Sequence, residues 1–146
     1  MERLDLFPDT ARIEKEALTI ARSDLASLAE KYGTPLYLYD RATLDHSLNS
    51  YQDPLEQFYP GLSGITYAGK AFLCLAIAEW TQQHGLWLDC AGQGEIAIAL
   101  RAGVPRQRLL VHGVNKSAAD LEAACDHAGI LVMDNLTEIA RLVENS

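Results

Sequence analysis

The chain has 146 residues, of which 49% are apolar and 22% charged, and its formal net charge is −8. This composition is typical of a folded globular protein and excludes a disordered chain. The length suits one domain but falls short of the about 250 residues of a closed (β/α)8 barrel. The acidic balance, with scattered Lys and Arg, argues against a nucleic-acid partner.

The first part of the chain, residues 1–24, shows no clear periodicity. Residues 25–31 are expected to form a short helix, because Asp24 suits the N-cap position and a glycine follows the last helical residue. The segment 35–40 is predicted to be a strand. Residues 41–58 are predicted to form a helix, which Pro54 can interrupt.

From residue 65 onward, apolar strands alternate with helices. The starts of the predicted strands, at residues 65, 86, 109 and 130, are 21, 23 and 21 residues apart, the length of one βα unit. These strands are continuous apolar runs, which is typical of strands buried on both faces and predicts a parallel sheet covered by helices. The predicted strands are 65–68, 86–90, 109–112 and 130–134, and the predicted helices are 72–84, 94–102, 117–127 and 136–143.

Two architectures fit this repeated βα pattern, an open doubly wound sheet and the first half of a barrel. In both, ligands bind at the carboxyl ends of the strands. Lys70 follows the strand 65–68 there, between small residues and apolar ones. Partial burial would favour its neutral amine, which can attack an aldehyde and form a Schiff base. The alternative is a solvated lysine at the start of a helix.

Other polar residues follow the neighbouring strands. Asp89 could orient the amine of Lys70 by its charge, or it could cap the next helix or loop. The segment 92–95 could approach a ligand through its backbone amides, but a tight turn with Glu95 at a helix N-terminus is the favoured interpretation. His112 is expected to be a satisfied histidine at a strand end. No metal-ligand spacing and no G-x-G-x-x-G or P-loop motif occurs.

Cys74, Cys90 and Cys125 are an odd number of cysteines without a CxxC pair. They predict buried free thiols in a reducing cytosol rather than a disulfide or a zinc site. No apolar run approaches the about 20 residues that span a bilayer, and the first ten residues lack the apolar core of a signal peptide. A cytoplasmic protein without a membrane partner is therefore expected.

Several motifs, in this order, resemble the fold-type III pyridoxal-phosphate decarboxylases. Tyr67–Ala71 (YAGKA) looks like the family's lysine motif, and Tyr32–Asp40 (YGTPLYLYD) is similar to the typical entry segment of these enzymes. Asp89–Ile96 matches D-x-x-S-x-G-E-[LI] with Gly92 in place of the serine. His112–Ser117 (HGVNKS) is similar to the H-G-N-N-K-[ST] stretch of the diaminopimelate decarboxylases, as is Ala99–Pro105.

The resemblance, which covers about residues 24–145, implies an alanine-racemase-like (β/α)8 barrel of which this chain is the incomplete N-terminal part. Residues 25–146 would be the partial pyridoxal-binding domain, and 1–24 an extension associated with the family's β-domain. Lys70 would be catalytic and would bind pyridoxal 5'-phosphate, with Ala68 packed nearby and Asp89 beside the lysine.

The function that the resemblance implies is decarboxylation of meso-diaminopimelate to lysine by a homodimer. Two alternatives stay open: an ornithine- or arginine-type decarboxylase of the same fold, and a non-catalytic pyridoxal-phosphate-binding or interaction fragment. The family's phosphate loop, the acidic partner of the pyridine nitrogen and the histidine under the ring would follow residue 146. The chain is therefore expected to be an N-terminal fragment or a truncated reading frame with negligible activity alone.

Overall fold

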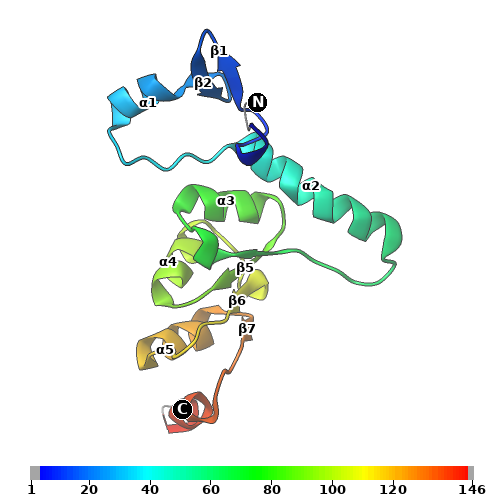
Figure 1. The fold of residues 1–146 in the computed structure, drawn as a ribbon. Helices are drawn as coiled ribbons and strands as arrows, with labels where there is room; N and C mark the ends of the chain where they lie inside the picture. The colour runs from blue at the N-terminus through cyan, green and yellow to red at the C-terminus, as the bar shows by residue number, and fades with distance from the viewer. Residues whose placement is uncertain (1–3, 145–146) are drawn as a thin grey trace. The chain divides into compact units, whose positions relative to one another are not determined.

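The fold is that of a computed structural model, which describes residues 4–144, and the chain separates into two units, 1–61 and 62–146 (Figure 1). We call them the N-terminal unit and the sheet unit. The sequence predicts a domain boundary after residue 24, where the partial barrel domain would begin. This boundary stays a prediction.

The N-terminal unit contains a small antiparallel sheet that the sequence analysis missed. Its strands β1, β2 and β3 pair in that order, and each pair is joined by a two-residue turn. Both turns, Lys15–Glu16 and Ala21–Arg22, have φ near +49° and +65°. Hairpin turns of this kind normally contain Asn or Gly, so their sequence signal is absent here. The strands are Arg12–Glu14, Ala17–Ile20 and Ser23–Asp24.

The two helices of this unit lie close to their predicted positions. Helix α1 is Leu25–Tyr32, and the Asp24 side chain accepts a hydrogen bond from the Ser27 backbone N–H at 2.7 Å, which confirms the predicted N-cap. Gly33 follows with φ +84°, a conformation that favours glycine. Helix α2, Arg41–Phe58, continues through Pro54 without interruption.

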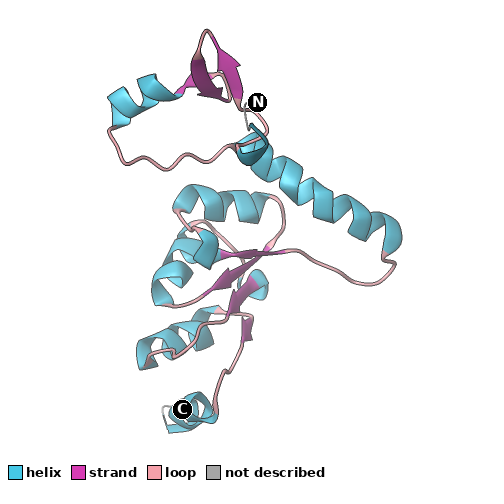
Figure 2. Ribbon diagram, in the orientation of Figure 1, coloured by secondary structure: helices cyan, strands magenta, loops and turns pink. Residues whose placement is uncertain are grey.

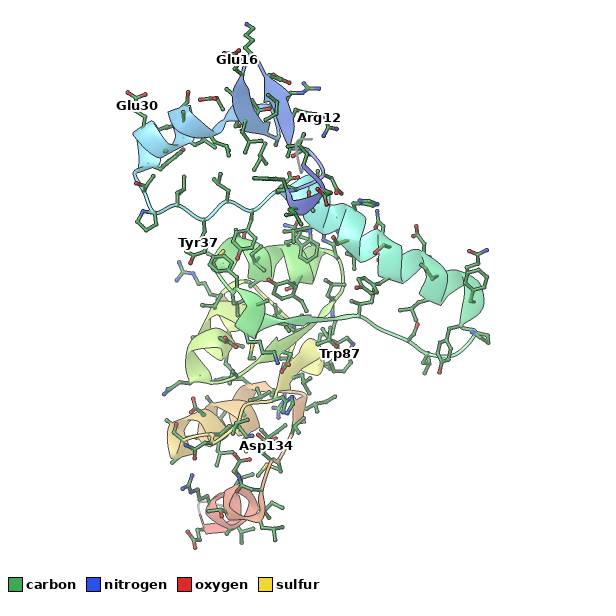
Figure 3. All side chains as sticks on the ribbon, viewed as in Figure 1. Arg12, Glu16, Glu30, Tyr37, Trp87 and Asp134 are labelled. Carbon is green, nitrogen blue, oxygen red and sulfur yellow. The ribbon has the colours of Figure 1, made fainter. Side chains whose placement is uncertain are left out.

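The predicted strand 35–40 is wrong. The segment is extended but belongs to no sheet, and its side chains from Leu36 to Tyr39 are exposed, Tyr37 by 83% (Figure 3). An apolar β-branched or aromatic run forms a strand only where another backbone offers ladder hydrogen bonds, and no described residue pairs with it.

The sheet unit is built from the βα units that the spacing predicts (Figure 2). Its four strands are parallel in the order β4-β5-β6-β7, and Ala68 lies in register with Asp89, which lies in register with Leu110. The elements are β4 (Thr66–Ala68), α3 (Leu75–Gln83), β5 (Trp87–Cys90), α4 (Gln93–Arg101), β6 (Leu109–Val111), α5 (Ala118–His127), β7 (Ile130–Leu131) and α6 (Leu136–Glu144).

One face of this sheet forms the core, because helices α3, α4 and α5 lie along it (Figure 1). Leu88, Leu109 and Val111 point toward these helices and are fully buried. On the other face, Trp87, Leu110 and Ile130 line an open hollow. The expected burial of the strands on both faces is therefore wrong for the second face, where Thr66 and Ile130 are exposed.

Helix α3 begins at Leu75, three residues later than predicted. Residues Gly69–Ala71 form a 3-10 turn, and Phe72 and Cys74 are extended. The Tyr67 hydroxyl donates a hydrogen bond to the Phe72 carbonyl at 2.7 Å, which holds this extended stretch against β4. In the described chain, no helix is long and apolar enough to cross a membrane.

The first hairpin supplies a test of the positive-φ turn. Changing Lys15→Asn and Glu16→Gly should slow hydrogen exchange of the β1 and β2 amides about fivefold, because a non-glycine residue in this conformation costs about 1 kcal/mol. Amide exchange followed by NMR measures the effect, with the α1 amides as the internal control. Unchanged exchange rates in β1 and β2 would contradict the positive φ angles of residues 15 and 16.

Candidate functional site

The carboxyl ends of β4, β5 and β6 bring together the residues that the sequence singles out. Ala68 and Asp89 are register partners and therefore point to the same face of the sheet. His112 continues β6, since its backbone N–H donates to the Cys90 carbonyl at 2.9 Å. It lies two residues beyond Leu110, the partner of Asp89, and so shares that face. We call this end of the sheet the carboxyl edge.

Lys70 lies in the 3-10 turn that directly follows β4. The turn packs tightly on β5, because a Cβ at Gly69 would lie 2.8 Å from the Asp89 carbonyl oxygen and 3.1 Å from Glu95 Oε2. The Lys70 side chain itself is exposed and has no hydrogen-bond or ion-pair partner within residues 4–144. The predicted partial burial of Lys70 is thus wrong for this chain, since its side of the sheet is open.

Asp89 carries an unpaired buried oxygen. Its Oδ1 has no hydrogen-bond partner among the described residues. Burial raises the pKa of the Asp89 carboxyl above its ordinary 3.8, although the charges of His112 and Lys70 oppose this. Asp89 does not cap helix α4, whose N-cap is Gly92. Of the two interpretations that the sequence left open, the helix cap is therefore excluded.

The segment 91–95 forms the turn that the sequence favoured. Glu95 Oε2 accepts a hydrogen bond from the Ala91 backbone N–H at 2.6 Å. The Gln93 backbone N–H donates to Asp120 Oδ1 at 2.8 Å, so a carboxylate of this chain already occupies that amide. The Ala91 and Gln93 amides are therefore already bonded within the chain, which argues against a loop that binds a ligand through these amides.

A second lysine at this edge, Lys116, was missed. It is fully buried, and its Nζ lies 2.9 Å from Glu138 Oε2, 2.8 Å from the Gly113 carbonyl oxygen and 3.8 Å from Asp134 Oδ2. The hydrogen bond from Lys116 lowers the pKa of Glu138. The only sequence signal was the position of Lys116 in the HGVNKS stretch. Because its ammonium group is fully paired, Lys116 is unsuited to covalent chemistry.

His112 and Asp134 lie between the Lys70–Asp89 pair and the Lys116–Glu138 pair. His112 Nε2 lies 3.5 Å from Asp134 Oδ1, and Asp134 follows β7 (Figure 3). His112 is thus a paired residue, as expected, although its side chain is 51% exposed. Opposite charges alternate along the carboxyl edge in the order Lys70, Asp89, His112, Asp134, Lys116 and Glu138 when His112 is protonated.

The three cysteines differ in environment, and all of them are free. Cys90 is buried in the core, and desolvation, with smaller contributions from Glu95 and Asp89, raises the pKa of its thiol to about 12. Cys125 is exposed, contrary to the expected burial, because it lies on the outer side of α5. Among the described residues, no group of three or more His, Cys, Asp or Glu side chains could hold a metal ion.

Comparison with known proteins assigns this edge to a family. Residues 43–146 match the family model described as "Pyridoxal-dependent decarboxylase, pyridoxal binding domain". The chain belongs to the pyridoxal-dependent decarboxylases. The matched region contains all the residues of the carboxyl edge, including Lys70 and Asp89.

Curated relatives in this family carry the name diaminopimelate decarboxylase. The protein of Mycobacterium tuberculosis (strain H37Rv) is 40% identical over 97% of this chain and 32% of its own length. That of Bacillus subtilis (strain 168) is 41% identical over 86% of this chain and 28% of its own length. The chain thus spans about a third of the length of these relatives.

A solved decarboxylase structure agrees with the fold. Diaminopimelate decarboxylase from M. jannaschii, in complex with L-lysine, is similar with a TM-score of 0.82 and 27% identity, over 93% of this chain and 32% of that one. The parallel β4–β7 sheet with its helices is therefore the first part of the barrel of this family, as the sequence predicted.

The residues present fit the pyridoxal group that the family implies. Among residues 4–144, the carboxyl edge offers an amine without a partner, on Lys70, beside a buried carboxylate oxygen without a partner, on Asp89. A buried polar atom of this kind is costly unless a ligand or solvent satisfies it. The Lys70 side chain is exposed, whereas the Asp89 oxygen is buried beside it.

The pKa of Cys90 generates a prediction about thiol reactivity. A maleimide at neutral pH should modify Cys125 rapidly and Cys90 hardly at all, because the thiolate is the reactive form and Cys90 is buried with its pKa at about 12. Mass-spectrometric mapping of the adduct over time measures both rates. Cys125→Ser should remove the fast phase, and a fast phase that survives this change but disappears in Cys90→Ser would contradict the structure.

Burial of Asp89 generates a prediction about stability. The folded state favours the protonated carboxyl, so ionised Asp89 destabilises the sheet unit at neutral pH. This penalty decreases as the pH falls through the raised pKa and vanishes below the ordinary pKa of 3.8. Asp89→Asn should therefore stabilise the chain at neutral pH but not in acid.

Urea unfolding followed by tryptophan fluorescence measures this difference, since both tryptophans, Trp80 and Trp87, lie in the sheet unit. Asp126→Asn, at an exposed position on α5, is the matched control. A stabilisation by Asp89→Asn that is independent of pH would be incompatible with a buried, ionising carboxyl.

Proposed function

We propose that Lys70 attaches pyridoxal 5'-phosphate and that Ala68 and Asp89 help to hold it. The observation that carries this proposal is the pairing pattern at the carboxyl edge. Of the two lysines there, Lys116 is buried and fully paired, whereas Lys70 is exposed and without a partner among the described residues. Of these two lysines, only Lys70 therefore has an amine that can react with an aldehyde.

Each residue would contribute a distinct physical effect. When bound, pyridoxal phosphate supplies a ring that takes up the electrons released as a carboxylate leaves as CO2. Ala68 is half-buried on the same face as Asp89, and its small side chain leaves room for a flat group. Lys70 Nζ provides the point of covalent attachment.

Asp89 would govern the proton on this amine. Its Oδ1 is the atom that can hold a proton, since burial raises the pKa of the carboxyl and no described hydrogen bond commits that oxygen. When ionised, it attracts the Lys70 ammonium group, and when protonated it releases that attraction. His112, paired with Asp134, adds a third group whose charge acts on Asp89.

For the whole protein, we propose decarboxylation of meso-diaminopimelate to lysine. The support is the name shared by the relatives at 40% and 41% identity and the L-lysine in the similar M. jannaschii structure. These findings favour diaminopimelate over the ornithine- or arginine-type substrate. We further propose a homodimer in the cytoplasm, where thiols such as the free Cys74, Cys90 and Cys125 stay reduced.

Borohydride trapping tests the attachment site. Incubation with pyridoxal phosphate, reduction and peptide mapping should place the pyridoxyl group on Lys70 and leave Lys116 unmodified, because the Lys116 amine is paired and inaccessible. Lys70→Ala should abolish the mapped adduct. Lys31→Ala, which removes another exposed lysine, is the matched control and should leave the Lys70 adduct intact. A pyridoxyl group found mainly on Lys116 or Lys31 would refute the proposal.

A further inference from the structure

Helix α4 has an N-cap residue that cannot supply a side-chain hydrogen bond. Its N-cap is Gly92, which has no side chain to accept a hydrogen bond from the first turn. The free amides at a helix N-terminus need an acceptor, and the partial positive charge there favours an anion. The acceptor at this helix comes from a different element, 27 residues further along the chain.

That acceptor is Asp120, on the first turn of α5. Its Oδ1 accepts a hydrogen bond from the Gln93 backbone N–H at 2.8 Å. A Cβ at residue 92 would lie 2.8 Å from the same oxygen, so this position of the carboxylate requires either glycine there or a shift of the Asp120 side chain. The glycine at position 92 and the carboxylate at position 120 are therefore sterically matched.

The other oxygen of this carboxylate serves the N-terminus of α5. Asp120 Oδ2 accepts hydrogen bonds from the Ser117 backbone N–H at 2.9 Å and from the Ser117 hydroxyl at 2.6 Å. Ser117 Oγ in turn accepts from the Asp120 backbone N–H at 3.2 Å, which completes a capping box. Hydrogen bonds from Ser117 and Gln93 lower the pKa of Asp120, so the group is ionised at neutral pH.

One carboxylate thus links the loops that follow β5 and β6. The first loop leads into Glu95, which holds the Ala91 N–H and would lie 3.1 Å from a Cβ at Gly69, next to Lys70. The second loop contains His112 and ends at Ser117. A change in the first loop would therefore reach the turn that carries Lys70.

We propose that Asp120 is a positioning residue that clamps the turn at the start of α4, residues 91–95, to the loop 112–117, and thereby holds the Lys70 turn against β5. Gly92 is the complementary half of the clamp. The effect on Lys70 rests on the proposed function, whereas the clamp itself does not.

A sign reversal between two backgrounds tests the clamp. Gly92→Ser should lower the thermal unfolding midpoint of the otherwise unchanged chain, because its Cβ meets Asp120. In the Asp120→Ala background the same change should raise the midpoint, because the serine then supplies the missing N-cap. Purely additive effects of the two substitutions would overturn the proposal.

Amide exchange locates the effect. Asp120→Ala should speed exchange in the first turn of α4 about fivefold, the usual effect of losing a cap. It should speed exchange in the first turn of α5 less, because Ser117 Oγ remains there as an acceptor. Asp126→Ala, at an exposed position on the same helix, is the matched control. Equal behaviour of the two variants would overturn the clamp.

Labelling of Lys70 separates positioning from a merely structural role. Asp120→Ala should reduce borohydride-trapped pyridoxyl on Lys70 without changing trapping on Lys31, and Gly92→Ser in that background should not restore it, because a serine N-cap on α4 does not rejoin the two segments. If the unchanged chain takes no pyridoxyl on Lys70, the proposed function fails while the exchange and midpoint measurements still decide the clamp. If the clamp is confirmed but Lys70 labelling is unaffected by Asp120→Ala, the positioning role is refuted.

Discussion

The parallel register of β4, β5 and β6 is the constraint on which the site depends. It places Ala68 opposite Asp89 and brings the residues after each strand to the same edge of the sheet. The fully buried Leu88 and Leu109 stabilise this register, because a slip of one residue would turn them toward the open face. The hydrophobic core on one face thus positions the polar groups on the other.

Burial gives the two lysines of this edge opposite properties. Lys116 is enclosed with Glu138 and Asp134, and the burial of its charge is tolerated because its ammonium group makes a hydrogen bond to the Gly113 carbonyl and ion pairs with both carboxylates. The paired Lys116 ammonium group connects the segments that follow β6 and β7, and it is not available to react with a carbonyl group. Lys70 has the reverse environment, exposed and unpaired among the described residues, which leaves its amine available.

The polar groups at this edge support one another through the loops as well as through the strands. Asp120 links the loops after β5 and β6, and Glu138 accepts hydrogen bonds from the backbones of Lys116 and Asp134, which links the loops after β6 and β7. Carboxylates therefore join three successive loops of the barrel's first part. Loops tied in this way present their residues with less conformational freedom than loops held only at their ends.

The sequence by itself determined the repeated βα units, the helix that begins after Asp24 and the location of Lys70 and Asp89 at strand ends. All of these follow from local hydrophobic spacing and short motifs. It could not predict the strands around Lys15–Glu16, whose turn lacks Asn and Gly, and it wrongly predicted a strand at 35–40, because a strand needs a partner that local pattern does not reveal.

Only the tertiary structure decided which polar groups are paired. The bond from Gln93 to Asp120 and the ion pair of Lys116 with Glu138 join residues 27 and 22 positions apart, and the exposure of Lys70 depends on an uncovered sheet face. Contacts of this kind arise from the packing of whole elements, so no window of neighbouring residues contains their signal.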